Sequence, residues 1–179
     1  NLFHLGILML FGGHFVGLLT PKEVYHAIGL STQGKQIVAI AAGGFAGTLC
    51  LIGIALLLHR RHTEPRVRAN SRTMDFVILY WILITLLIGL VSIVASLSHL
   101  DGGVMVALSH WAQHLVTFRG DAASFIVNVP LIYKIHLFFG MTLFILFPFS
   151  RLVHVWSGFA SVAYVIRPYQ IVRRRGAAR

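Results

Sequence analysis

Charged residues are scarce in this sequence, and their scarcity excludes most kinds of soluble protein. Only 11% of the 179 residues are charged and 57% are hydrophobic, whereas soluble domains carry about 25% charged residues. The net charge of +10 is concentrated beside apolar runs and does not spread over a polar face. That distribution argues against a nucleic-acid partner. The composition therefore predicts a membrane protein in contact with lipid.

Cysteine is nearly absent as well. The one thiol, Cys50, lies within an apolar run. A single cysteine cannot form an intrachain disulfide, hold an iron–sulfur cluster or attach a c-type haem through Cys-x-x-Cys-His. We also find no glycine-rich phosphate loop and no internal repeat in the sequence. Any redox cofactor would therefore be held by other residues.

The beginning of the sequence has no recognisable signal peptide. Asn1 opens directly onto an apolar stretch, without the charged region and the small-residue cleavage site that a signal peptide requires. We therefore expect the natural N-terminus to lie upstream of Asn1.

Four apolar stretches are long enough to span a bilayer core of about 30 Å, which takes about 20 helical residues. They cover approximately residues 1–19, 36–58, 75–97 and 129–156. The sequence predicts an all-α membrane protein, a single domain over residues 1–179 with four transmembrane spans. The fourth would be about 42 Å long as one helix. We expect it to tilt or to emerge from the membrane, with a kink at Pro148.

Arginine residues predict the orientation of the chain. One group lies in residues 59–72, "HRRHTEPRVRANSR", between the second and third spans, and another follows the fourth span at 167–175. Cytoplasmic segments carry an excess of Lys and Arg, so both groups are expected in the cytoplasm together with the tail 157–179. Residues 20–35 and 98–128 would then lie outside.

The second external segment contains a stretch with helical periodicity. Apolar residues recur at helical spacing over residues 103–118, which predicts a helix lying on the membrane surface. His110 and His114 are one turn apart on it and could bind a metal. No third or fourth ligand is evident, so the sequence leaves their role open.

Four of the ten histidines lie within predicted spans. His4 and His14 belong to the first span, and His136 and His154 to the fourth. Ionisable side chains within hydrocarbon are costly and usually functional. Another four histidines lie in loops, where solvated side chains are expected: His26, His59, His62 and His99.

The spacing of the four intramembrane histidines predicts two pairs. His136 and His154 are 18 residues apart, five helical turns, so they would share one helix face. With the first and fourth spans antiparallel, His4 faces His154 near the cytoplasm and His14 faces His136 near the outside. Two facing imidazoles at each level suit bis-histidine ligation of two b-type haems. Hydrogen-bonded core histidines are the alternative.

One distance fits this pairing poorly. The rise along a helix is about 15 Å from His4 to His14 but about 27 Å from His136 to His154. Tilt, the kink at Pro148 and the side-chain rotamers would have to absorb the difference.

Glycines are frequent near these histidines. They are Gly6, Gly12, Gly13, Gly17 and Gly140. A flat porphyrin needs clearance beside a helix, which glycine supplies. Close packing of helices through small residues would explain the same pattern, and the sequence alone does not separate the two interpretations.

Three segments carry a resemblance to a known family. "NLFHLGILMLFGGHFVGLLTP", "RRHTEPRVRA" and "IHLFFGMTLFILFPFSRLVHVWS" closely resemble the gamma subunit of respiratory nitrate reductase, a membrane di-haem cytochrome b that oxidises quinol. The resemblance covers nearly the whole chain. Members of that family have five transmembrane helices, so it implies that this chain begins at the second and that the first is missing.

The resemblance implies the same haem pairs, His14 with His136 and His4 with His154. It also implies a bacterial inner-membrane protein that passes electrons to a cytoplasmic iron–sulfur beta subunit and on to a molybdenum-containing alpha subunit. Lys35 matches a lysine of the family's quinol site, with Gly13 and His14 beside it. A snorkelling interfacial lysine is the alternative.

Two arginines could hold the haem propionates near the cytoplasm, because the Arg fork suits carboxylates. These are Arg61 and Arg151. They could equally be orientation signals. The predicted spans contain no carboxylate away from their ends, which favours proton release at the outer side over a proton-pumping route.

Three rival functions remain at this point. The chain could be a non-catalytic membrane anchor with buried histidines, or a transporter in which histidines relay protons. It could also be a di-haem quinol-oxidising anchor of another cytoplasmic reductase. The sequence does not distinguish menaquinol from ubiquinol.

Overall fold

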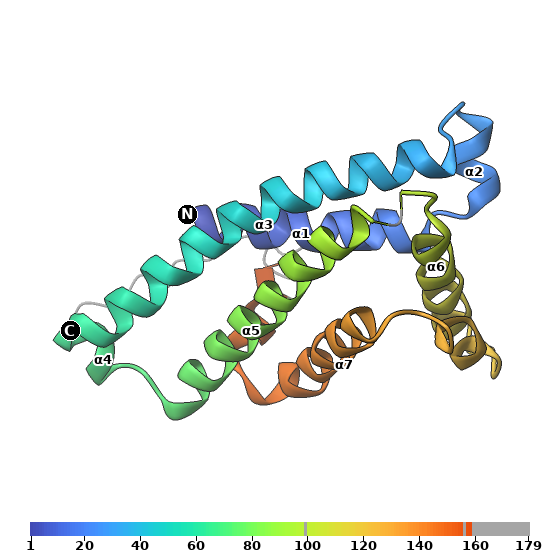
Figure 1. Cartoon of the computed structure of the whole chain (residues 1–179). Coiled ribbons are helices and arrows are strands. Elements are labelled where there is room, and N and C mark those ends of the chain that lie inside the picture. Colours follow the sequence, from blue (N-terminus) through green and yellow to red (C-terminus); the bar gives the residue numbers. More distant parts are fainter. Residues whose placement is uncertain (99, 156, 159–179) are drawn as a thin grey trace, which may run out of the picture.

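The computed structural model describes residues 1–98, 100–155 and 157–158, and the regular secondary structure in this part of the chain is all helical (Figure 1). The α-helices are α1 (Leu2–Leu19), α2 (Lys22–Ala27), α3 (Thr32–Thr63), α4 (Pro65–Ala69), α5 (Thr73–Ser96), α6 (Gly103–Val116) and α7 (Leu131–Leu146). Three short 3-10 helices are η1 (Ala122–Ile126), η2 (Phe147–Phe149) and η3 (Arg151–Val153).

Four helices are long and apolar enough to cross a membrane. They cover Leu2–Leu19, Thr32–Thr63, Thr73–Ser96 and Leu131–Phe149. The predicted fold class, an all-α membrane protein with four spans, is confirmed. At 32 residues, α3 is about 48 Å long and exceeds a bilayer core of about 30 Å, and its last turn carries Arg60 and Arg61.

The core lies between α3 and α5. Its buried residues on α3 are Cys50, Ile54 and Leu58, and those on α5 are Ile78, Leu79, Ile82 and Leu86. By contrast, α1 and α7 bury little of their surface within the chain. Their outer faces carry large exposed apolar side chains such as Phe11, Phe15, Phe138 and Phe144.

The first span packs closely against α3. A Cβ atom at Gly6 would lie 2.5 Å from the backbone nitrogen of Cys50, and one at Gly53 would lie 2.2 Å from that of Phe3. The two helices run antiparallel and touch backbone to backbone at these points, as small residues permit in membranes.

The last span packs antiparallel on α5 through three levels of contact. The Trp81 indole donates to the Phe139 carbonyl (3.1 Å), the His136 ring lies against Gly89, and the hydroxyls of Ser96 and Tyr133 lie 2.9 Å apart. This attachment fixes the height of His136 in the bundle.

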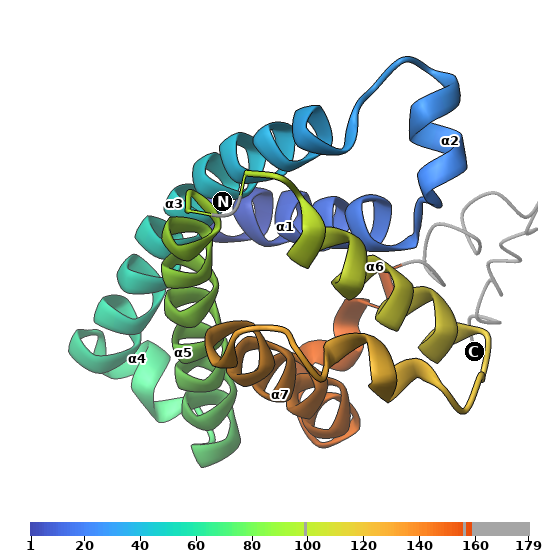
Figure 2. The ribbon, with the colours of Figure 1, turned by 45° about the vertical axis from the view of Figure 1, so that its right-hand side comes forward.

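At one end of the bundle, α6 lies crosswise between the end of α1 and the beginning of α7 (Figure 1). It caps α1, because Ser109 and Gln113 donate to the carbonyls of Gly17 (3.4 Å) and Leu18 (3.1 Å), which lack partners within the helix. Figure 2 shows α1, α5, α6 and α7 arranged as a ring.

The fourth span is not one continuous helix. It ends at Leu146, and two 3-10 turns follow, separated by Ser150 in an extended conformation (φ −122°, ψ 171°). Pro148 lies in the first of these turns and cannot donate to a helical ladder. The chain therefore turns away from the α7 axis, back toward α1 (Figure 1).

Candidate functional site

One pair of histidines joins α1 to α7. The rings of His14 and His136 have their centroids 6.0 Å apart, with an angle of 37° between their planes. The Nδ1 atom of His14 lies 2.7 Å from the Leu10 carbonyl, and a carbonyl can only accept. Nδ1 therefore carries the proton, which leaves Nε2 of His14 with a free lone pair.

A second pair joins α1 to the turn after α7. The ring centroids of His4 and His154 are 6.3 Å apart, at an angle of 71°. His154 follows η3 directly, and its Nδ1 donates to the Arg151 carbonyl (2.6 Å). Again the tautomer is fixed and Nε2 is left free.

These distances fit two imidazoles bound to one metal ion. A metal–imidazole bond is about 2.0–2.1 Å, and the nitrogen lies about 1.1 Å from the ring centre, so two opposed rings have centres about 6.3 Å apart. Both pairs are within a few tenths of an ångström of that value. Rings in direct contact have centres about 4.5–7 Å apart, and both pairs also fall within that range.

His136 is the most enclosed of the four rings. A Cβ at Gly89 would lie 2.8 Å from its Cε1 atom, so only glycine leaves room for the ring there. Among the described residues, the buried Nδ1 of His136 has no hydrogen-bond partner. A buried polar atom without a partner is rare and costly, and a ring held for a ligand would account for it.

Glycines near the histidines divide into two groups. Gly6 serves helix packing, because its missing Cβ lets α3 approach. At Gly12, Gly13, Gly17 and Gly140 an added Cβ would meet nothing within 4 Å. Helix packing therefore explains Gly6 and does not explain the other four, for which clearance beside a porphyrin stays a prediction.

The break after Leu146 explains how His154 reaches His4. His136 and His154 do not share the face of one helix, so the five-turn argument from the sequence is wrong. Its premise, an unbroken helix over residues 129–156, fails at Pro148 and Ser150. The rise of about 27 Å between His136 and His154 assumed one straight helix. Because the chain turns back toward α1, that value does not apply, and neither does its mismatch with the rise of about 15 Å from His4 to His14.

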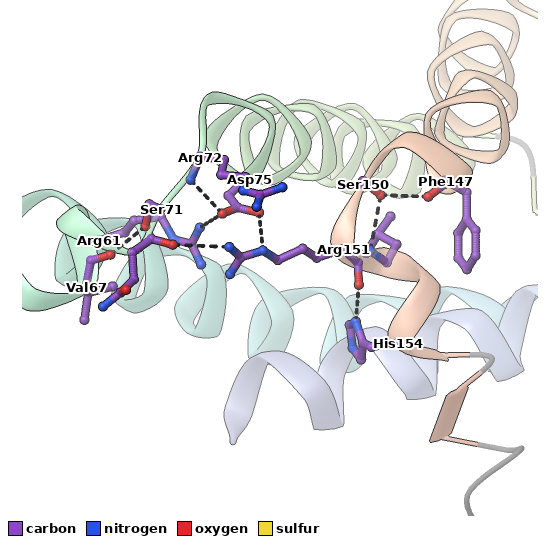
Figure 3. A network of polar contacts seen from close by, with 11 residues as sticks. Arg61, Val67, Ser71, Arg72, Asp75, Phe147, Ser150, Arg151 and His154 are labelled. Atoms are coloured by element: carbon purple, nitrogen blue, oxygen red, sulfur yellow. Dashed lines mark hydrogen bonds and ion pairs between the residues drawn. The ribbon is translucent and has the colours of Figure 1, made fainter.

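Arg61 and Arg151 meet at a carboxylate of the chain itself. Asp75, with 4% of its surface exposed, receives Arg61 Nη1 at 3.4 Å on one oxygen and Arg151 Nε at 3.2 Å on the other (Figure 3). From the sequence, Asp75 is only the first residue of the predicted span 75–97. One signal in the sequence could have indicated the role of Asp75: it is a single acidic residue close to a cluster of arginines.

Lys35 lies at the other end of the bundle. Its ammonium lies 3.5 Å from the Thr20 carbonyl at the end of α1 and 4.2 Å from the centre of the Tyr25 ring. The residue is buried. These contacts place Lys35 beyond the end of α1 that follows Gly13 and His14, and not in hydrogen-bond contact with either.

His110 and His114 contact neighbours of their own. Both rings pack on Phe125 of η1, and His114 donates to the Asp121 carboxylate (2.7 Å). That hydrogen bond lowers the pKa of Asp121 below its ordinary value. His26 and His62 are likewise held by hydrogen bonds, to Thr32 and to the Leu58 carbonyl, whereas His99 lies outside the described residues.

Comparison with known proteins decides the family. The family model for the nitrate reductase gamma subunit matches residues 1–175. The chain belongs to the nitrate reductase gamma subunit family. This confirms the family that the sequence motifs predicted.

Individual members of the gamma subunit family are similar over almost the whole chain. The respiratory nitrate reductase 1 gamma chain of Escherichia coli is 50% identical over 175 residues, covering 98% of this chain and 76% of the relative. The nitrate reductase gamma chain of Bacillus subtilis is 36% identical, covering 98% and 77%. A nitrate reductase-like protein of Mycobacterium tuberculosis is 34% identical over 179 residues, but this chain spans only 26% of its length.

The family and the four apolar helices together make this gamma subunit homologue a multi-pass membrane protein. The predicted cytoplasmic tail, residues 157–179, lies outside the described residues except for 157 and 158.

Proposed function

We propose that this chain is the quinol-oxidising cytochrome b subunit of a respiratory nitrate reductase, with two b-type haems. His14 and His136 would hold one, and His4 and His154 the other. The proposal rests on two imidazole pairs, 6.0 and 6.3 Å apart, in a member of this family. When bound, haem supplies one-electron transfer, which no side chain of the chain provides.

The chain's own residues orient the ligands. Carbonyls of Leu10 and Arg151 fix the tautomers of His14 and His154, which leaves the Nε2 lone pair of each ring available to a metal. The missing side chain of Gly89 leaves the space beside α5 that the His136 ring occupies. Such support lowers the cost of ordering the ligands when haem binds.

Quinol would bind near the His14 pair, between Gly13 and the end of α1 where Lys35 lies. Lys35 carries three N–H donors and one described carbonyl partner, Thr20, so donors remain for a quinol oxygen. Protons would leave at this end. By the positive-inside rule, the arginine-bearing end with Arg61 would face the cytoplasm, so electrons would move inward from the outer pair to the inner pair.

Charge separation follows from this arrangement. Moving one elementary charge across the membrane corresponds to about 2.3 kcal/mol per 100 mV. Inward electrons and outward proton release both contribute to the membrane potential without a proton channel. The electrons would pass to a cytoplasmic iron–sulfur beta subunit and a molybdenum-containing alpha subunit. Co-purification with those subunits and molybdenum analysis of the native complex would identify the acceptor.

Reduced-minus-oxidised absorption spectra of single-histidine variants test the haem assignment. His14→Ala and His136→Ala should each remove the same haem, and His4→Ala and His154→Ala the other, because each haem would lose one of the two histidines that hold it. His110→Ala is the matched control and should keep both haems. Absence of b-haem bands from the purified, haem-supplied protein would refute the function, and loss of different haems within one pair would refute the pairing.

Replacement of Lys35 tests the quinol site. Lys35→Ala should raise the KM for quinol about tenfold or more while both haem spectra stay unchanged, because a hydrogen bond from a charged donor contributes about 1.5–3 kcal/mol. Lys22, an exposed lysine on the neighbouring α2, supplies the control Lys22→Ala. Equal KM values in the two variants would exclude Lys35 from the site.

A further inference from the structure

Asp75 is a buried carboxylate at which three segments of the chain meet. Its oxygens face Arg61 from the last turn of α3, Arg151 from η3 and the backbone N–H of Arg72 (2.9 Å), with the carboxylate itself at the start of α5 (Figure 3). Only 6% of the Asp75 side chain is exposed. A charge buried to this extent persists only when it is paired and hydrogen-bonded, and here all the partners are cationic side chains or N–H donors.

The Arg151 side chain is held at both ends of its guanidinium. Nε faces Asp75 at 3.2 Å, and Nη2 donates to the Asn70 carbonyl at 3.2 Å. Yet 61% of this side chain is exposed, so little packing restrains it. The ion pair and the hydrogen bond are therefore what fix its position.

The Arg151 backbone leads directly to the candidate haem ligand. Its carbonyl accepts the Nδ1 proton of His154 at 2.6 Å. The segment from Phe147 to His154 has only two short 3-10 turns joined by an extended residue, and such turns lack the continuous hydrogen-bond ladder of an α-helix. The turn therefore depends on a tertiary anchor to hold His154 opposite His4.

We infer that Asp75 is a positioning residue that anchors this turn through Arg151 and so holds His154 in place to ligate the same iron as His4. The inference rests on the proposed function for the identity of the ligand. Asp75 has no role in the His14–His136 pair, where the His136 ring instead lies against Gly89 of α5.

The first test removes the charge of the carboxylate and keeps its shape. In the full chain, Asp75→Asn should lose the His4–His154 haem selectively, so haem per polypeptide falls from two to one and only the spectrum and potential of the His14–His136 haem remain. Asp75→Glu should restore the second haem at least in part. Asp121→Asn makes the same chemical change at the opposite end of the bundle and should keep both haems.

Two outcomes would overturn the inference. One is an Asp75→Asn protein with both haems at wild-type spectra and potentials. The other is loss of both haems together, which would give Asp75 a general role in stability and none in positioning.

A second test does not need haem. In a Cys50→Ala background, His4→Cys with His154→Cys should be joined by a short bis-maleimide, and adding Asp75→Asn should lower the yield several-fold. The pair His14→Cys with His136→Cys is the control and should be unaffected. Equal yields for the first pair with and without Asp75 would overturn the inference. If the wild-type chain proved to bind no haem, the proposed function would fail and this measurement would still decide the anchoring.

Discussion

The four paired histidines are supported in different ways although they are the same residue. His14 and His154 each donate the Nδ1 proton to a nearby carbonyl, whereas the half-buried His136 ring lies against Gly89 and its Nδ1 has no partner among the described residues. Support of this kind tunes ligand basicity and orientation. The two haems would therefore differ in potential even with identical ligands.

Gly89 is the residue whose replacement should act on one haem alone. In Gly89→Ala, the new Cβ would lie 2.8 Å from Cε1 of His136, and overpacking of this kind costs about 1–3 kcal/mol. We expect loss of the His14–His136 haem or a shifted midpoint potential, measured by redox titration followed at the haem bands. Gly44→Ala, where the Cβ meets nothing within 4 Å, is the control. An unshifted potential in Gly89→Ala would show that the ring does not depend on this contact.

Residue identity predicted part of this site. Histidine within an apolar span is unusual enough to stand out by itself, and the four residues do come together in the expected pairs. Asp75 did not stand out, because acids at helix starts are common. Its partner Arg151 is remote in the chain, and nothing in the local sequence shows that the two side chains meet.

At the scale of elements, the decisive feature is the break that follows α7. Hydropathy identifies residues 129–156 as an apolar stretch, but it cannot distinguish a helix from a turn made of the same residues. Periodicity arguments then assume one axis for the whole stretch. Pro148 gave the only local signal, and it predicted a kink, whereas the change of direction also needs the extended Ser150.

The packing of α1 on α3 gives the prediction at this scale. In Gly53→Ala the Cβ would lie 2.2 Å from the backbone nitrogen of Phe3, and backbone cannot rotate aside as a side chain can. The helices would have to separate, with a cost of about 1–3 kcal/mol. Thermal unfolding in detergent should show a lower midpoint for Gly53→Ala than for the control Gly44→Ala. Equal midpoints would mean that α1 shifts freely along α3.

At the scale of the whole molecule, a core between α3 and α5 has one further span on each side. On one side α1 packs closely on α3, on the other α7 packs on α5, and the histidine pairs lie where these two sides approach. Bound haem would link α1 to α7. Because haem would bind only the folded chain, it would also stabilise the fold. Asp75 with its two arginines and Lys35 lie at opposite ends of the bundle, so the two ends of the bundle differ chemically.

Each facing pair takes one histidine from the first span and one from the last part of the described chain, and this has a consequence for biosynthesis. Domains form from the N-terminus at about 5–20 residues per second, so His14 would wait about 6–25 seconds for His136 to be made. His154 comes later still. On the proposed ligand assignment, neither haem site is complete until α7 or the turn after it has been made, and the outer site can be completed before the inner one.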